Sequence, residues 1–371
     1  MHRINIHSLL SKHWLNALLL LIAFSLLPAP YPLPPAFAVP THLDRSKVPQ
    51  GCGACHKGHG QRGTLMLNSP EVSLCFKCHG FSRKGTPGES LTDIYSVINK
   101  PSNHPVIDTA GYHMPGETLP EKNPATPRHV SCYDCHNPHE STKGKPFKGI
   151  NGYSGKGARS RHGAEKEYEV CYLCHSDSAN LPSGETNIAL DFDTSNPSYH
   201  PVENYGKGKS VPSLLRQYNT SSIITCSDCH GNDDPSGPKG PHGSIYSPIL
   251  RDRYDIQPVA ESPSAYRLCY SCHDRNSILG DESFKAHKRH IVYSETPCIA
   301  CHDAHGSRIY PALIRFDDRL VTPNSMGELT YMPFIPGKPR CFLSCHVNGV
   351  NYEHRLTNGQ YCINADCSPG W

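Results

Sequence analysis

The sequence predicts a mostly irregular fold with short α-helices and little β-structure. The 371-residue chain contains 30 glycines and 34 prolines, which are spread along its length and interrupt helices and strands alike. Only 37% of the residues are hydrophobic, so little aliphatic material remains for a core. The chain also has 18 cysteines and 24 histidines. A bound group held by these side chains would therefore supply much of the buried apolar mass.

The cysteines recur in one pattern: two cysteines with two residues between them, followed at once by a histidine. Seven sites have this spacing, and an eighth, Cys341-Phe-Leu-Ser-Cys345-His346, is one residue longer. Disulfides and zinc ribbons give no reason for the histidine, and redox-active cysteine pairs usually occur once. The pattern is the attachment signature of c-type haem, in which the thiols bond to the vinyl groups and the histidine binds the iron.

We therefore predict eight covalently attached haem c groups, which would drive folding of a chain that is largely unfolded without them. The predicted haem-bonding residues are Cys52, Cys55, Cys75, Cys78, Cys132, Cys135, Cys171, Cys174, Cys226, Cys229, Cys269, Cys272, Cys298, Cys301, Cys341 and Cys345. The predicted proximal iron ligands are His56, His79, His136, His175, His230, His273, His302 and His346.

The spacing of the motifs groups them into four pairs, which indicates an internal repeat. We expect one octahaem domain over residues 39–371, with pairs at about 42–79, 104–175, 200–273 and 290–346 and a C-terminal tail over 347–371. Amphipathic stretches at 164–170 and 264–268 predict single helical turns that lead into the second sites of two pairs. The linkers are predicted to be loops that wrap the haems.

Eight further histidines are needed if every iron has two histidine ligands. One follows the first site of each pair, three residues on except where an insertion displaces His242, and one precedes each pair. The predicted distal ligands are His42, His59, His104, His139, His200, His242, His290 and His305. The remaining histidines are His113, His129, His162, His287 and His354, of which His129 and His287 are alternatives to His104 and His290, and His354 is an alternative for the last haem.

Methionine does not recur with the repeat, which favours all-histidine iron of low potential. A histidine that follows a first site is expected to bind the second haem of its own pair and hold the two haems together. The histidines before the pairs serve either the preceding or the following haem. If one of them serves a neighbouring subunit, ligation would be the joint of a polymer.

Residues 1–38 read as a secretory signal peptide, with Arg3 and Lys12 before an apolar run over 14–27 and a small-residue cleavage site, Ala36-Phe37-Ala38. An uncleaved membrane anchor is the alternative. No later stretch is long and apolar enough to span a bilayer.

The formal charge of +3 includes the two basic residues Arg3 and Lys12, and haem propionates would make the mature protein acidic. No basic block typical of nucleic-acid binding is present.

The motifs and the histidine three residues after Cys-x-x-Cys-His resemble the multihaem c-type cytochromes with a doubled Cys-x-x-Cys-His motif, over residues 42–354. The resemblance implies an elongated, haem-packed architecture. The eight motifs, the export signal and the loop content look like the extracellular cytochromes of metal-reducing microbes, some of which polymerise into filaments. These relatives imply an electron-transfer protein, not an enzyme, located outside the cell or at its surface, with the periplasm as an alternative.

The implied partners are redox proteins or extracellular acceptors, with a homopolymer as one arrangement. Two other functions are considered. A nitrite, hydroxylamine or tetrathionate oxidoreductase would keep an open iron, often with lysine in place of the motif histidine, whereas all eight motifs here end in histidine. A periplasmic or porin-bound electron conduit is the other, although its linkers are usually shorter.

Two cysteines remain outside the motifs. Cys362 and Cys367 lack a following histidine and are predicted to form a disulfide that fixes the tail, as is usual in an oxidising compartment. Free thiols or an intermolecular bridge are the alternatives.

Overall fold

The computed structural model describes residues 40–367, except 59–64, 81–91, 108–128, 156–158, 161–162, 178–180, 182–183, 334–339, 348–349, 358–359 and 364–365. The expected signal peptide therefore lies outside the described residues, as do His59, His113 and His162. The side chains of His346, Cys362 and Cys367 also lie outside them.

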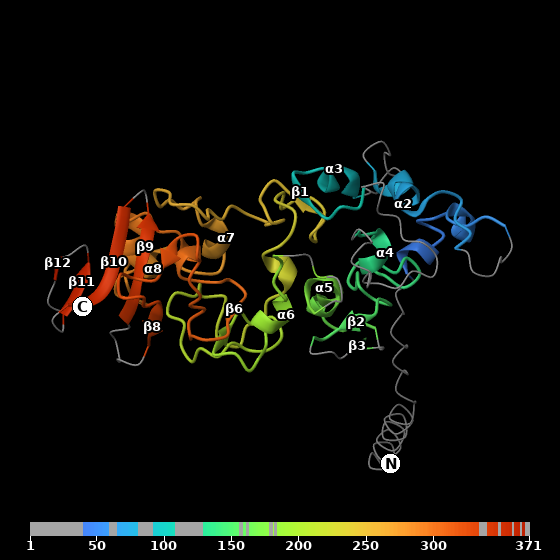
Figure 1. Ribbon diagram of the computed structural model, residues 1–371. Coiled ribbons are helices and arrows are strands. Elements are labelled where there is room, and N and C mark those ends of the chain that lie inside the picture. The colour runs from blue at the N-terminus through green and yellow to red at the C-terminus, as the bar shows by residue number, and fades with distance from the viewer. Residues whose placement is uncertain are drawn as a thin grey trace, which may run out of the picture. The chain divides into compact units, whose positions relative to one another are not determined.

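Short helical segments separated by loops make up the chain from residue 40 to about residue 300 (Figure 1). The α-helices are α2 (Glu71–His79), α3 (Ile94–Ile98), α4 (Cys132–Cys135), α5 (Glu167–His175), α6 (Ile188–Asp191), α7 (Arg267–Tyr270) and α8 (Arg275–Leu279). The 3-10 turns are η1 (Thr41–Leu43), η2 (Gly51–Ala54), η3 (Cys226–Asp228) and η5 (Cys298–Ala300), and a π-helical turn forms η4 (Arg289–Tyr293). The prediction of a mostly irregular fold with short helices is confirmed.

The strands form three two-stranded ladders and one larger C-terminal sheet (Figure 1). The ladders pair β1 (Ser102–Asn103) with β5 (Gly243–Ser244), β2 (Gly152–Tyr153) with β3 (Arg159–Ser160), and β4 (Ser198–Tyr199) with β6 (Gly306–Ser307). The larger sheet is antiparallel and consists of β7 (Val321–Thr322), β8 (Thr330–Met332), β9 (Arg340–Val347), β10 (Val350–Thr357), β11 (Gln360–Ile363) and β12 (Asp366–Cys367).

The seven standard motifs each place a cysteine in a helical turn, whereas the stretched motif lies in a strand. The turn is closed by a backbone hydrogen bond such as that from His136 N to Cys132 O, 2.9 Å long. At α4 the turn begins with a capping box in which the Ser131 N–H donates to Asp134. Cys341 and Cys345 instead belong to β9. The two helical turns expected at 164–170 and 264–268 form later than predicted, as α5 and α7, which contain motif cysteines themselves.

The hydrophobic core of the described residues is divided into small clusters of three to five buried residues, each packed against a motif cysteine. Val72, Ile98 and Val106 pack beside Cys132, for example, and Ala265, Tyr266 and Ile291 beside Cys298. A fold of this length ordinarily has one contiguous core. Buried residues of three clusters, and residues packed against the fourth, instead line a continuous cavity of about 4120 Å³, several times the size of a typical single-ligand pocket.

Candidate metal centres

Sixteen histidine rings of the described residues form eight pairs with ring centres 5.9–6.3 Å apart. A first-row metal binds an imidazole nitrogen at about 2 Å, so two rings on opposite sides of one metal have centres about 6 Å apart. The pairs are His56–His139, His42–His79, His136–His242, His104–His175, His230–His305, His200–His273, His287–His302 and His290–His354.

The histidines that precede the first three pairs lie opposite the motif histidine of the second site of their own pair. His42 faces His79 at 6.1 Å, and His200 faces His273 at 6.3 Å. His104 faces His175 in the same way, at 6.2 Å. The sequence leaves open whether a histidine before a pair serves the preceding or the following haem site. The structure places each of these three histidines opposite the second site of the pair that follows it.

The histidines that follow a first site reach backwards along the chain. His139 lies 5.9 Å from His56, in the preceding pair, and His242 lies 6.1 Å from His136. The expectation that such a histidine serves the second site of its own pair is therefore wrong. The physical reason is that the histidine before the pair already occupies that position.

Backbone carbonyls fix the orientation of many of these rings through Nδ1. The Nδ1 atoms of His56, His136 and His302 lie 2.9–3.1 Å from the oxygens of Leu65, Pro146 and Ala312. When Nδ1–H donates to a carbonyl, Nε2 is left without a proton and free to bind a metal. The rings are therefore prepared for metal binding through Nε2.

The same kind of contact joins the two predicted distal ligands of one motif pair to each other. His104 Nδ1 lies 2.6 Å from the Pro241 oxygen, next to His242, and the β1–β5 ladder continues the contact. His200 Nδ1 bonds to the oxygen of Ala304, next to His305, beside the β4–β6 ladder. One two-stranded ladder thus positions the predicted distal ligands of both sites in a pair.

The loops after three of the first sites share an unusual backbone conformation. Met66, Ile249 and Leu313 have φ of 50°, 52° and 58°, in the left-handed region that non-glycine residues rarely adopt. Each carbonyl accepts a hydrogen bond from the residue after the motif histidine, as from Lys57 to Met66 at 2.9 Å. Strain of this kind persists where the surroundings impose it, often at functional sites.

Burial keeps the rings in the neutral form that binds metals. Burial, followed by neighbouring histidines, lowers the pKa of His242, His273, His287 and His354 to about 4 in each case. Burial also lowers the pKa of His104 and His302. These imidazoles are therefore uncharged at neutral pH, as metal ligation requires.

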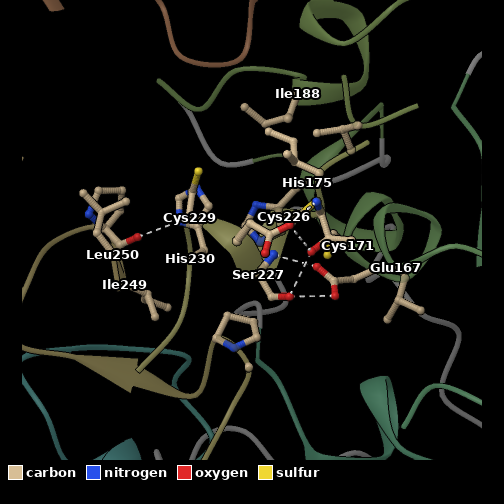
Figure 2. A pocket seen from close by; sticks show the side chains of 18 of the residues that line it. Glu167, Cys171, His175, Ile188, Cys226, Ser227, Cys229, His230, Ile249 and Leu250 are labelled. Atoms are coloured by element: carbon tan, nitrogen blue, oxygen red, sulfur yellow. Dashed lines mark hydrogen bonds between the residues drawn. The ribbon is translucent and has the colours of Figure 1, made fainter. Parts of the chain in front are cut away.

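Thiols of successive sites are neighbours along the whole chain. Cys171 on α5 contacts Cys226 on η3 (Figure 2), and this hydrogen bond, together with burial, raises the pKa of the Cys171 thiol. Equivalent thiol contacts join Cys75 to Cys132 and Cys269 to Cys298. The candidate sites therefore follow one another in the order of the sequence.

A glutamate side chain forms hydrogen bonds across the contact between the first and second pairs, and another does so between the second and third pairs. Glu167 accepts hydrogen bonds from the backbone N–H and the hydroxyl of Ser227, at 2.7 and 2.8 Å (Figure 2). Glu71, which is buried, accepts from the Tyr133 N–H at 3.2 Å. Sequence reasoning missed both residues, although each stands four positions before the first cysteine of a second site.

The fourth pair uses two histidines that were left over in the sequence assignment. His287 lies 6.3 Å from His302, and His354 lies 6.0 Å from His290. In the first three pairs the histidine opposite the first site comes from the next pair. Because no motif follows the fourth pair in this sequence, a histidine close to that pair, such as His287, could have been predicted to face His302. His354 carries no local signal. Of the eight distal ligands predicted from sequence, seven lie in ring pairs, and His59 falls outside the described residues.

The side chains fit a set of covalently attached haems: paired thiols, neutral imidazoles at the spacing of one shared metal, and one continuous apolar cavity. This combination defines the class of c-type cytochromes. Residues 128–311 match the family model described as outer membrane cytochrome MtrC/MtrF-like, domains II/IV, and residues 46–84 match the doubled CXXCH motif family. The chain is a multihaem c-type cytochrome.

Neither the curated proteins nor the solved structures contain a significant match to this chain. Within the described part of the chain, no helix is both long and apolar enough to cross a membrane.

Proposed function

We propose that the protein is an electron carrier with eight covalently bound haems, each held between two histidines. The eight histidine ring pairs carry this proposal, because they equal the number of motifs and each has the spacing of two ligands on one metal. Haem held in this way supplies one-electron exchange between ferric and ferrous iron.

The two histidines of each pair would hold one haem iron together and leave it closed to other ligands. A closed iron cannot bind a substrate directly, so the arrangement supports electron transfer and argues against a nitrite, hydroxylamine or tetrathionate oxidoreductase. Buried rings such as those of His104 and His302 are further fixed by carbonyl hydrogen bonds of 2.6 and 2.9 Å, which limits the movement of the ligands between redox states.

The thiol contacts support a continuous row of sites. Contacts at Cys75–Cys132, Cys171–Cys226 and Cys269–Cys298 bridge from one pair to the next, and Cys301 neighbours Cys345 at the C-terminal end. We infer that electrons enter at one end of this row and leave at the other. Redox proteins or extracellular acceptors are the proposed partners at the two ends.

We place the protein outside the cytoplasmic membrane, at the cell surface or beyond it. The signal-like residues 1–38 and the matching family, whose description is of outer membrane cytochromes, support this location. A polymeric haem wire is a further possibility that the eight motifs suggest. Each described ring pair is complete within one chain, however, so such a polymer would have to be held by packing and not by a shared ligand.

Mass spectrometry and electron paramagnetic resonance of the secreted protein test the proposal together. We expect eight covalent haems per chain and a ferric spectrum that is entirely low-spin. A native protein with one stoichiometric high-spin haem would contradict the purely electron-transferring role and favour an enzyme. Electron microscopy of the same sample then distinguishes filaments from single particles and from a membrane complex.

A further inference from the structure

We propose that Gly243 and Gly306 are positioning residues for two of the predicted distal ligands, His242 and His305, which they follow directly in the sequence. This inference rests on the proposed array of eight haems. Neither glycine is among the residues that line the cavity. Each one instead allows the strand that carries its histidine to lie against the end of a short helix from an earlier part of the chain.

The two glycines have almost no free space beside their Cα atoms. A Cβ atom added to Gly243 would lie 2.1 Å from the backbone oxygen of Val97, in α3. One added to Gly306 would lie 2.0 Å from the backbone oxygen of Asp191, the last residue of α6. Even the close Cα–H···O contacts between strands have carbon–oxygen distances of about 3.3–3.6 Å. A side chain at either position would therefore collide with the helix backbone.

Backbone conformation does not explain why these two residues are glycines. Gly243 lies in β5 and Gly306 lies in β6, and neither has a positive φ, whereas nearby Gly240 has a φ of 96°. The strand conformation is open to residues with a side chain. Glycine within a strand often marks a place where another backbone approaches closely. The approach of the helix carbonyl is therefore the reason for glycine at both positions.

Hydrogen bonds hold the helix carbonyl at Gly243 in place. The Val97 oxygen accepts from the Lys100 N–H at 3.1 Å. The Lys100 ammonium lies 2.7 Å from Asp233, whose carboxylate also accepts from the Ile245 N–H at 3.0 Å. The helix end is thus tied to the segment that contains β5. The collision cannot be relieved by the carbonyl alone, so the strand must shift.

The carbonyl at Gly306 is held by different residues in the same way. The Asp191 oxygen accepts from the Asn196 side chain at 2.9 Å. The Asp191 carboxylate is 1% exposed and accepts from Arg308 Nε at 2.8 Å, just beyond β6. The same close approach is therefore fixed independently at two equivalent ladders.

The strand that would shift carries one histidine of a ring pair. The ring of His242 faces His136 at 6.1 Å, and the equivalent ring before Gly306 lies 6.2 Å from its partner. Two rings share one metal only at about this spacing. A side chain at Gly243 would therefore withdraw His242 and leave the site of His136 with one histidine.

His139, the equivalent histidine of the second pair, shows that the requirement belongs to the ladder. Glu140 follows it, and residues 138–140 form a turn and not a strand. His139 nevertheless faces His56 at 5.9 Å. Glycine is thus needed after the histidine where a strand packed against a helix carries the ring.

Carbon monoxide binding to the reduced protein tests the proposal, because carbon monoxide binds a haem iron that has an open axial position. The variants are Gly243→Ala and Gly306→Ala. Gly144→Ala is the matched control, since nothing lies within 4 Å of a Cβ atom added there. We expect each of the first two variants to bind one carbon monoxide per chain and to gain one high-spin ferric haem. We expect the control and the unsubstituted protein to bind none.

A double variant shows whether the glycine acts through its histidine, because two changes that remove the same ligand are not additive. His242→Ala alone should bind one carbon monoxide per chain. The combination of His242→Ala with Gly243→Ala should still bind one. Binding of two would show that the glycine substitution opens a different site, and would contradict the proposal.

Both glycine variants must yield a protein with eight haems by mass and one bound carbon monoxide. No binding would show that the strand tolerates a side chain, and failure to obtain the haem protein would show that the glycine supports the whole fold. Either result at either position overturns the proposal. Failure of the proposed function is distinguishable, because the unsubstituted protein would then have fewer than eight haems or would itself bind carbon monoxide.

Discussion

The first three motif pairs and the fourth reach the same ring geometry by different routes. In the first three, a histidine from a later motif crosses back to the first site, as His139 does to His56, and a helical turn carries every motif. In the fourth, His287 supplies the first site from nearby sequence, and the second site lies on a strand. In the first three pairs, the histidine opposite the first site comes from the next pair along the chain. In the fourth pair, His287 from nearby sequence takes this place.

The C-terminal region also has more protein structure of its own. Five buried residues, including Val321 and Leu343, form a cluster beneath a six-stranded sheet. The first three pairs have clusters of three to five buried residues but only two-stranded ladders in place of a larger sheet. The two regions should therefore differ in how strongly they depend on haem.

The largest expected effect follows from preventing haem attachment altogether, by expression without c-type maturation. Residues 40 to about 280 should lose their fold, because the cofactors that fill the cavity are missing. The sheet formed by β7–β10 should keep partial protection. Hydrogen exchange of the apo and holo proteins measures this. Equal loss of protection in both regions would show that the sheet has no independent stability.

A smaller effect is expected when one histidine of a ring pair is replaced by alanine in each of the two regions. His104→Ala removes a ring whose Nδ1 bonds to the Pro241 oxygen, next to His242, and so joins the two predicted distal ligands of the second pair. His287→Ala removes a ring with a weaker contact, 3.3 Å from the Ser283 hydroxyl. Each variant should gain one high-spin haem, and His104→Ala should lower the free energy of unfolding by about 1 kcal/mol more than His287→Ala. Denaturant titration combined with electron paramagnetic resonance tests the difference, and the reverse order would contradict it.

The contact between the second and third pairs offers a more local test. Glu167→Gln weakens two hydrogen bonds to Ser227 and should lower the free energy of unfolding by about 1–2 kcal/mol. The third contact has Ala265 at the equivalent position and no such bond. Glu185→Gln, at an exposed position, is the control and should change stability little. Identical unfolding curves for the two variants would show that Glu167 does not fasten the pairs.

The smallest expected effect is a pH dependence at the third pair. Hydrogen bonds from Arg275 and then Tyr270 hold the pKa of Glu261 below its ordinary value of 4.5, although its burial opposes this. Because the folded pKa is the lower one, the stabilisation is present above pH 4.5 and is lost as the pH falls through the folded pKa. Glu261→Gln should remove this part of the acid sensitivity. Unfolding measured from pH 6 to about pH 3 tests it, with Glu185→Gln again as the control. An unchanged slope would exclude Glu261 as its source.

Seven of the eight motif histidines could be placed from the local cysteine pattern and lie in the ring pairs, while the side chain of His346 lies outside the described residues. The pairing of rings could not be predicted, because it depends on contacts between distant segments. His139 was recognised as a ligand, yet its partner His56 belongs to another pair. His354 was left as an alternative for the last haem because only the β9–β10 register brings it opposite Leu343, beside the thiols.

The backward reach of His139, His242 and His305 has a consequence for how the protein is made. For the proposed exported haem protein, the thiols of a first site would become accessible two motifs before the histidine that faces their motif histidine. Haem attachment in that order would leave centres that have one histidine each, and each would be completed only when a later segment arrives. At the fourth pair the order is reversed, because His287 precedes in the sequence the site whose motif histidine, His302, it faces.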